Sequence, residues 1–483
     1  MNNLNSSFSF PFTRREMLRR AGAGLGFSAL ATLLSESGLA AAPTSPGSPW
    51  STLPAKAKSV IWLFMNGGPS QVDTFDYKPA LAEWNDKPLP GFDINTAFDS
   101  HKAGNLMASP FKFRQHGQSG RWVSELFPHM ATQVDKMAFI HSCHTDSNNH
   151  SPALYMMNTG TPRMGRPSFG SWSSYGLGTE NANLPAFVVM ADPRNRGLPR
   201  GKGNNWGSGF LPSRYQGTFL QPKGEPIANL TPPSGSNENT LAAQRADLDL
   251  LAALNRPHLE AHPAESDLDA RIASFELAFR MQTQAPEVFD LAGEPESVRK
   301  DYGLEESHCG HFARQCITAR RLVERGVRFV QLYSGGTENQ QSWDCHANLK
   351  GNHSSFAAEV DQPIAALLRD LEQRGLLEST LVIWGGEFGR LPTAQKDAQP
   401  GRDHNPHGFT IWMAGAGVKP GIAYGATDEL GHKAAVDKVH IHDLHATWLH
   451  LLGVDHEKLT YRFNGRDFRL TDVHGEVVQA VLS

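Results

Sequence analysis

Short apolar runs that stop at glycines constrain the fold of this chain more than any other feature. Leu381–Trp384 is rich in branched and aromatic residues and is followed by Gly385, and Phe409–Ala414 is followed by Gly415. Such runs, without alternating polar residues, are typical of strands buried on both faces of a sheet. Further runs of this kind occur at 59–65, 137–140, 186–190 and 327–333. Because helical periodicity separates several of them, the sequence predicts an α/β fold with a doubly wound, mostly parallel central sheet flanked by helices.

A polar loop joins the runs at 381–384 and 409–414. Ligands of open α/β sheets bind beyond the carboxyl ends of the strands, so this loop is where we expect chemistry. Carboxylates mixed with imidazoles suit a divalent cation such as zinc or manganese. Arginines can hold an anion bidentately, with surface ion pairing as the alternative. The candidate residues of the loop are Glu387, Arg390, Arg402, Asp403, His404 and His407.

A second polar cluster follows the run at 327–333. Asp344 and His346 lie two positions apart, so on an extended segment their side chains point the same way. A helical pattern of apolar residues then covers 356–371, and Gly375 stands where a helix C-cap is expected. This order of strand, loop, helix, strand and loop predicts a βαβ unit with both polar loops at one end.

Periodicity and capping predict several other elements. Pro363 lies inside the helical pattern after the second cluster, which predicts a kink or a helix start near Asp361. Asp443 is placed as the N-cap of a helix that opens near residue 441. The Gly- and Pro-rich stretch at 192–233 predicts a loop that covers the site. Further helical patterns cover 124–136, 239–259 and 267–281.

The order of these motifs resembles the metal-binding half of the alkaline phosphatase and sulfatase superfamily, and implies its sandwich fold. The resemblance implies that Asp344, His346 and His404 bind one metal ion. It implies that Glu387 is the acidic ligand of a second ion, and His407 is an alternate imidazole. More closely, the chain resembles a large bacterial family of exported sulfatase-related proteins of unknown function (domain of unknown function 1501). The phrases that carry this resemblance lie at 66–76, 343–346, 387–390, 401–404 and 425–429.

The first predicted strand departs from the superfamily pattern. In the superfamily the first strand ends in a metal-binding Asp. In this chain the same position is occupied by Asn66, which is a poorer metal ligand. Asp73 follows seven residues later and is the candidate ligand for a second metal ion, with Asp76 as a further option. The alternative is that the second ion is weakened or lost.

The segment at 150–160 resembles the sulfatase nucleophile segment, which starts a helix and ends in Thr-Gly. Free N–H groups at a helix N-terminus stabilise an anion there. His150 occupies the place of the expected Cys or Ser, which leaves three alternatives. Ser151 is the nucleophile, or His150 is a nucleophile or metal ligand. In the third, no nucleophile remains, and the site uses metal-activated water or only binds.

The N-terminus predicts export. Arg14-Arg15 and the Ala/Gly-rich stretch after them match a twin-arginine signal peptide over 1–42, read by the twin-arginine export machinery. Residues 43–483 then form a single domain, with a loop and helical insertion at about 192–300. No later apolar run is long enough for a membrane span. Four cysteines without a CxxC spacing do not indicate a disulfide framework, and a net charge of −4 gives no sign of nucleic-acid binding.

Together these features predict a periplasmic or exported metal-dependent hydrolase of sulfate or phosphate esters. The cofactor is one or two divalent ions, with zinc, manganese and calcium as candidates. The substrate is an anionic ester, for which sulfated polysaccharide is one candidate class. The alternative is a non-catalytic binding or scaffold protein that keeps the sulfatase-like fold.

Overall fold

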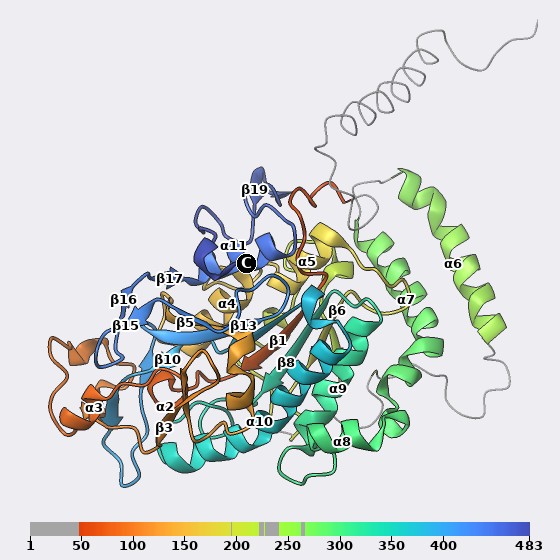
Figure 1. Ribbon diagram of the computed structural model, residues 1–483. Helices are drawn as coiled ribbons and strands as arrows, with labels where there is room; N and C mark the ends of the chain where they lie inside the picture. The colour runs from red at the N-terminus through yellow and green to blue at the C-terminus, as the bar shows by residue number, and fades with distance from the viewer. Residues whose placement is uncertain (1–47, 195, 222–226, 228–240, 262–265) are drawn as a thin grey trace, which may run out of the picture. The chain divides into compact units, whose positions relative to one another are not determined.

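A nine-stranded mixed sheet forms the centre of the protein (Figure 1). The computed structural model describes residues 48–194, 196–221, 227, 241–261 and 266–483, so the predicted signal peptide lies outside the described residues. The strand order is β14-β5-β13-β9-β1-β8-β6-β7, with β17 also paired to β5. The bounds are β1 (Ser59–Met65), β5 (Met137–His144), β6 (Phe187–Met190), β7 (Thr218–Leu220), β8 (Phe329–Ser334), β9 (Thr380–Gly385), β13 (Phe409–Ala414), β14 (Ile422–Tyr424) and β17 (Val439–His440).

The sheet is mostly parallel, as the apolar runs predict. β1 lies between β8 and β9 and is parallel to both, so Leu63 pairs with Leu332 on one side and Trp384 on the other. β13 is the antiparallel strand in the middle, paired to β9 and β5. Every residue of β1, β8, β9 and β13 is buried, which explains why these strands lack polar alternation.

Helices cover both faces of the sheet, which confirms the predicted fold class. Ile61, Leu63 and Met65 of β1 belong to one apolar core, together with α9 (Gly310–Glu324) and α10 (Leu349–Gln373). The alternate residues of β1 belong to a second core on the opposite face. That core contains residues of α4 (His150–Thr159), α5 (Phe169–Leu177) and α11 (Ile441–Leu451), as Figure 1 allows the reader to follow.

The predicted βαβ unit is formed by β8, α10 and β9. Its helix starts earlier than expected: Asn348 is the N-cap, and its side chain accepts from Gly351 N. The helix continues through Pro363, because its buried apolar face packs along its whole length against the sheet. Asp361 has a different role, since its carboxylate accepts from the backbone N–H groups of His129 and Met130.

Two local predictions were wrong. Residues 124–136 do not form one helix: β4 (Arg121–Ser124) pairs with β3 (Phe113–His116), and only Met130–Lys136 is helical, as the 3-10 helix η3. Pro128 stands before η3 and prevents a continuous helix. Asp443 is not the N-cap of α11 either. His440 is the N-cap, and Asp443 completes a capping box by accepting from His440 N.

The stretch predicted as an insertion carries two long helices, α6 (Leu241–Ala261) and α7 (Ser266–Phe289). No residue of α6 is buried. The same stretch also supplies β7 to the edge of the central sheet. No helix within the described ranges is long and apolar enough to cross a membrane. All four cysteines are free and buried.

The packing of α10 on the sheet yields a stability prediction. Leu367 is fully buried on the sheet-facing side of α10, so Leu367→Ala should lower the free energy of unfolding by about 2–5 kcal/mol. Leu254→Ala is the matched control, because Leu254 on α6 is 69% exposed and its change should stay within about 0.5 kcal/mol. Chemical denaturation measures both; equal losses would contradict the packing described here.

Candidate metal centre

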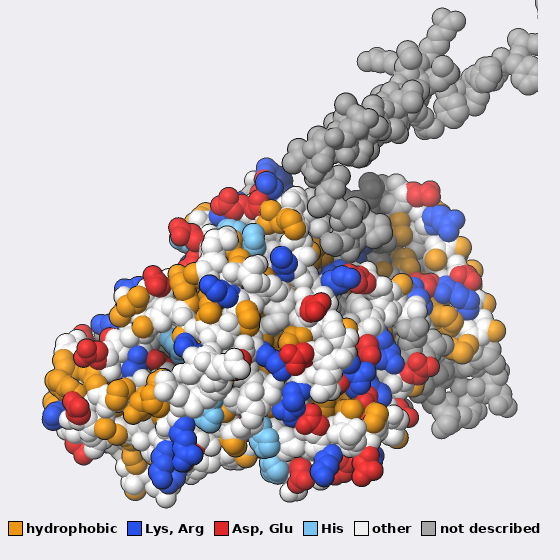
Figure 2. Space-filling model, in the orientation of Figure 1, with side chains coloured by type: hydrophobic (Ala, Val, Ile, Leu, Met, Phe, Trp, Pro, Cys, Tyr) orange, Lys and Arg blue, Asp and Glu red, His pale blue; other side chains and the backbone are white. Residues whose placement is uncertain are grey.

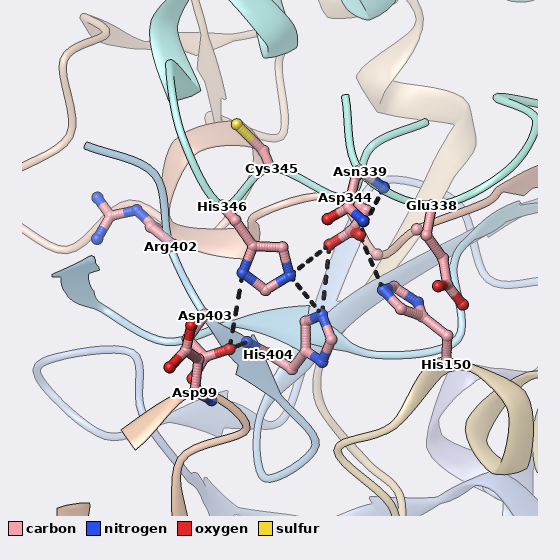
Figure 3. Close-up of polar contacts among 12 residues, drawn as sticks. Asp99, His150, Glu338, Asn339, Asp344, Cys345, His346, Arg402, Asp403 and His404 are labelled. Atoms are coloured by element: carbon pink, nitrogen blue, oxygen red, sulfur yellow. Dashed lines mark hydrogen bonds and ion pairs between the residues drawn. The ribbon is translucent and has the colours of Figure 1, made fainter. Parts of the chain in front are cut away.

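Four side chains from three separate segments converge beyond the ends of the central strands (Figure 3). The loop after β8 brings Asp344 and His346, and β12 (His404–Asn405) brings His404. The first residue of α4 brings His150. One ligand atom from each lies within 4.8 Å of all the others, which is a separation that a single metal ion could span.

The distances within this cluster are short. Asp344 Oδ1 lies 3.0 Å from His346 Nε2 and 3.3 Å from His404 Nε2. Asp344 Oδ2 lies 3.3 Å from His150 Nε2. The Nε2 atoms of His346 and His404 are 3.0 Å apart. The structure therefore brings together Asp344, His346 and His404, the three residues that the resemblance assigned to one ion, and places with them His150, whose predicted roles included that of a metal ligand.

Each imidazole is oriented through its other ring nitrogen. Nδ1 of His150 lies 2.7 Å from Glu387 Oε1, and Nδ1 of His404 lies 2.6 Å from the Asn148 carbonyl oxygen. Nδ1 of His346 lies 2.9 Å from Gln395 Oε1. Because these oxygens only accept hydrogen bonds, each Nδ1 must carry the proton. In the neutral imidazole the Nε2 lone pair is then left to face the cluster.

This arrangement tests whether the residues fit a metal ion. Two Nε2 lone pairs at 3.0 Å repel each other unless a proton or a cation lies between them. His150 Nε2 is moreover buried without a hydrogen-bond partner among the described residues. Imidazole nitrogens with a carboxylate oxygen are a common donor set for zinc. The cluster fits a divalent ion.

Glycines at the end of β1 allow the loops to approach. Gly67 has a φ of +102°, and a Cβ there would lie 2.4 Å from Asp344 N. Its backbone N–H donates to both oxygens of Glu387, at 3.0 and 3.1 Å. Any larger residue would push the Asp344 loop away from β1.

Charges around the cluster keep Asp344 ionised. Burial alone would raise its pKa, but the Arg390 guanidinium at 2.8 Å and the three histidines hold that pKa well below its usual range. Burial would lower the pKa of His150, but the carboxylates of Asp344 and Glu387 beside its two ring nitrogens raise that pKa to about 9. Burial is the main cause that keeps the pKa of His404 well below its ordinary value, and the charge of His150 lowers this pKa further.

The two arginines predicted to hold an anion are fully buried and already paired. Arg390 donates to Asp344 and to the carbonyl oxygens of Gly67, Gly68 and Arg402. Arg402 binds Asp73 with two nitrogens, at 2.6 and 3.2 Å. Its remaining hydrogen bonds go to the backbone carbonyls of Met107 and Pro392. Both guanidinium groups therefore join segments of the scaffold.

The other predicted site residues lie around the cluster in different roles. Asp73 forms an ion pair with Arg402. Burial raises the pKa of Asp73, but the charge of Arg402 and the hydrogen bonds from Arg402 and Ser70 outweigh burial, so the pKa is lowered. Glu387 accepts hydrogen bonds from His150 Nδ1 and Gly67 N, and among the described residues it belongs to no second group of metal-ligating side chains. His407 is exposed and packs against His432. Ser151 N donates to the Asn149 side chain that caps α4.

Sequence reasoning missed the residues that orient and shield the imidazoles. Gln395 belongs to β11 (Thr393–Gln395), and Asn148 belongs to the loop before α4. Phe98 and Phe388 pack on the His404 ring, with ring centroids 4.3 and 4.7 Å away. No spacing signal marks any of them, because their contacts depend on how distant loops pair.

Comparison with known proteins places the chain in a family context. A family model described as "Protein of unknown function (DUF1501)" matches residues 57–482. No curated protein matches the sequence.

The fold is similar to several solved structures at low identity. The TAB5 alkaline phosphatase is 13% identical, with 78% of this chain and 96% of that chain covered and a TM-score of 0.33. The PsFucS1 sulfatase from Pseudoalteromonas sp. is 12% identical, with 83% of this chain and 68% of that chain covered and a TM-score of 0.34. The lipoteichoic acid synthase LtaP from Listeria monocytogenes is 9% identical, with 89% of this chain and 78% of that chain covered and a TM-score of 0.34.

The cluster predicts about one divalent ion per chain, because it offers one set of converging donors. Elemental analysis of purified protein measures this content. His404→Ala and His150→Ala should each lower it strongly, whereas Ser151→Ala should leave it unchanged. Metal-free native protein, or two ions per chain, would contradict this interpretation.

The contact between Glu387 and His150 predicts that loss of the Glu387 side chain weakens metal binding without changing the number of ions bound per chain. Glu387→Ala removes the acceptor that fixes His150 Nδ1, so titration should find about 10–100-fold weaker metal binding. Glu387→Gln keeps an acceptor oxygen, so its metal affinity should lie between those of the wild type and Glu387→Ala. If Glu387 is instead a ligand of a second ion, the number of bound ions will fall.

Proposed function

The chain belongs to the DUF1501 family of proteins of unknown function, and from that premise we propose that it is an exported metal-dependent hydrolase of sulfate or phosphate esters. The observation that carries the proposal is the convergence of three oriented imidazoles on the buried Asp344 carboxylate. A constellation of this kind is costly to bury unless it binds a cation.

Zinc or manganese fits the donor set better than calcium. Three of the four donors are imidazole nitrogens, whereas calcium prefers six to eight oxygen ligands. Cys345 lies between two of the donors in sequence but contributes no sulfur, since its thiol donates to the Ala347 carbonyl. A divalent ion bound here supplies a Lewis acid and lowers the pKa of a coordinated water.

The residues of the chain position this ion and limit its access to water. Asn339 N donates to Asp344 Oδ2 at 2.8 Å, and Arg390 donates to Oδ1, so the carboxylate cannot rotate freely. His346 is the most exposed of the four donors, with 19% of its side chain accessible. We infer that an ester reaches the centre from the His346 side, where Phe98 forms the adjoining wall.

The geometry favours His150 as a metal ligand over His150 as a nucleophile. Its Nδ1 is committed to Glu387, and its Nε2 faces the Asp344 carboxylate. A nucleophilic nitrogen would need an open approach, which a side chain at 5% exposure lacks. Hydrolysis at this site would therefore use activated water or, as the remaining alternative, Ser151.

One observation favours a second candidate function, a non-catalytic metal-bearing binding or scaffold protein. The protein offers four donors, the number that structural zinc sites use, whereas catalytic zinc sites usually use three protein ligands and one water. Both buried arginines are committed to the scaffold and so do not offer donors to a substrate anion.

Export is part of the proposal. Its support is the twin-arginine pattern at residues 14–15 and the small residues at 40–42. A protein exported in the folded state carries its ion with it, which agrees with a cluster buried as deeply as this one. Arg14→Lys combined with Arg15→Lys should retain the precursor in the cytoplasm, as cell fractionation would detect.

The enzymatic proposal is tested with small chromogenic substrates. Metal-loaded protein should hydrolyse an aryl sulfate or an aryl phosphate, and a chelator should abolish this activity until zinc or manganese is restored. His404→Ala should lower kcat/KM by at least about 100-fold, because it removes a ligand. Ser151→Ala should retain activity if activated water is the nucleophile.

The contrary outcomes separate the alternatives. Loss of activity in Ser151→Ala at full metal content would make Ser151 the nucleophile. Full metal content without turnover of either substrate class would favour the non-catalytic function.

A further inference from the structure

Exposed aromatic side chains are concentrated in one short part of the chain. Among the described residues, six aromatic side chains are classed as exposed, and four of them lie between residues 77 and 122. Tyr77, Trp84, Phe98 and Trp122 are 36–46% exposed. Figure 2 shows hydrophobic side chains gathered on the face around α3 (Ala80–Glu83), which belongs to this part of the chain. Contiguous exposed apolar patches mark binding surfaces in soluble proteins.

Two of these rings, those of Tyr77 and Trp122, form a platform with the Phe113 ring at the β3–β4 hairpin. Tyr77 stacks on Phe113 with ring centroids 5.0 Å apart and contacts Trp122 at 4.5 Å. Gln115 pairs with Trp122 across the hairpin, so Phe113 and Trp122 lie on the same face. The rings support one another and are fixed in place, although Tyr77 and Trp122 remain more than one third exposed.

The same hairpin carries cations that lack an acidic partner. Neither Lys112 nor Arg114 forms an ion pair with any described residue. With His116 and Glu125 they line a hollow of about 260 Å³ on the hairpin. Residues 77–122 contain six lysines and arginines against four acidic residues, whereas the whole chain has a net charge of −4. This part of the chain therefore complements an anionic ligand.

The segment 93–102, in the same part of the chain, contacts the candidate metal centre. Phe98 lies on the His404 ring at 4.3 Å. Asp99 N donates to Asp403, the neighbour of His404. The Thr96 carbonyl accepts from Asn148, whose own carbonyl orients His404. A ligand held on this segment is thus close to the metal ligands.

We propose that the aromatic array of residues 77–122 binds a sulfated polysaccharide and presents it to the metal centre. The platform of Tyr77, Phe113 and Trp122 packs against the apolar face of a sugar ring. Lys112 and Arg114 attract the sulfate groups along the chain. This inference rests on the proposed hydrolase function and deepens it by naming the substrate class and its subsite.

The composition of the surface favours this ligand over other partners. The hairpin combines aromatic rings, against which sugar rings pack, with the cations Lys112 and Arg114, which complement sulfate groups. Single-stranded nucleic acid also stacks on aromatic rings, but it requires a continuous basic groove. The hollow holds Glu125 beside Lys112 and Arg114 and is therefore not a continuous basic groove.

Binding is tested without relying on turnover. Full-length exported protein is run by affinity electrophoresis through gels containing dextran sulfate, carrageenan or chondroitin sulfate, with unsulfated dextran and single-stranded DNA as separate arms. At least one sulfated polymer should retard the protein more than dextran or DNA does. Trp122→Ala should weaken that binding about 10-fold, and Trp122→Phe should retain most of it. Lys112→Ala with Arg114→Ala should weaken it and reduce its dependence on salt.

The control is Phe463→Ala, because Phe463 is 39% exposed on a different hairpin and should not affect binding. Thermal melting identifies any variant that has lost its fold. If Trp122→Ala is one of them, polymer binding is compared between the wild type and Trp122→Phe. No retardation by any sulfated polymer, equal retardation of wild type and Trp122→Ala, or tighter binding of DNA would each overturn the proposal. His404→Ala separates the two hypotheses, since it should abolish hydrolysis and leave polymer binding intact.

Discussion

The structure of the site depends on one buried charge, the carboxylate of Asp344. It accepts hydrogen bonds from Arg390 and from Asn339 N, and three imidazole nitrogens lie within 3.3 Å of it. An ionised carboxylate inside a protein is destabilising unless its partners replace the lost water. Arg390 supplies one positive charge. A divalent cation bound by the imidazoles would add to this stabilisation through the Asp344 oxygen atoms that face them.

The arginines extend this pairing into the scaffold. Arg390 links the glycines after β1 to the Asp344 loop, and Arg402 links Asp73 to the loop that carries His404. Arginine suits these positions because its planar fork serves several acceptors at once, which a lysine cannot do. Removing one partner of such a pair leaves a buried charge without compensation, which costs about 3–5 kcal/mol. The scaffold and the candidate site are therefore stabilised by the same contacts.

Much of the fold could be predicted from the sequence, because buried strands carry a strong local signal. The run at 59–65 became β1 with the same bounds, and Phe409–Ala414 became β13. The order of strands and loops placed both polar loops at one end of the sheet, and the resemblance to the superfamily implied that Asp344, His346 and His404 would converge there. The direction of β13 and the true destinations of Arg390 and Arg402 were not, since they depend on pairing between residues far apart in sequence. The role of Glu387 also required the position of His150, which belongs to a different helix.

X-ray absorption spectroscopy of the zinc-loaded protein tests the central claim most directly. The account predicts a first shell of nitrogen and oxygen at about 2.0–2.1 Å, with the outer-shell scattering of about three imidazoles. His150→Ala should reduce that imidazole signal by about one third if all three imidazoles bind the ion. A shell made only of oxygen, or sulfur at about 2.3 Å, would contradict a centre built from His150, His346, His404 and Asp344.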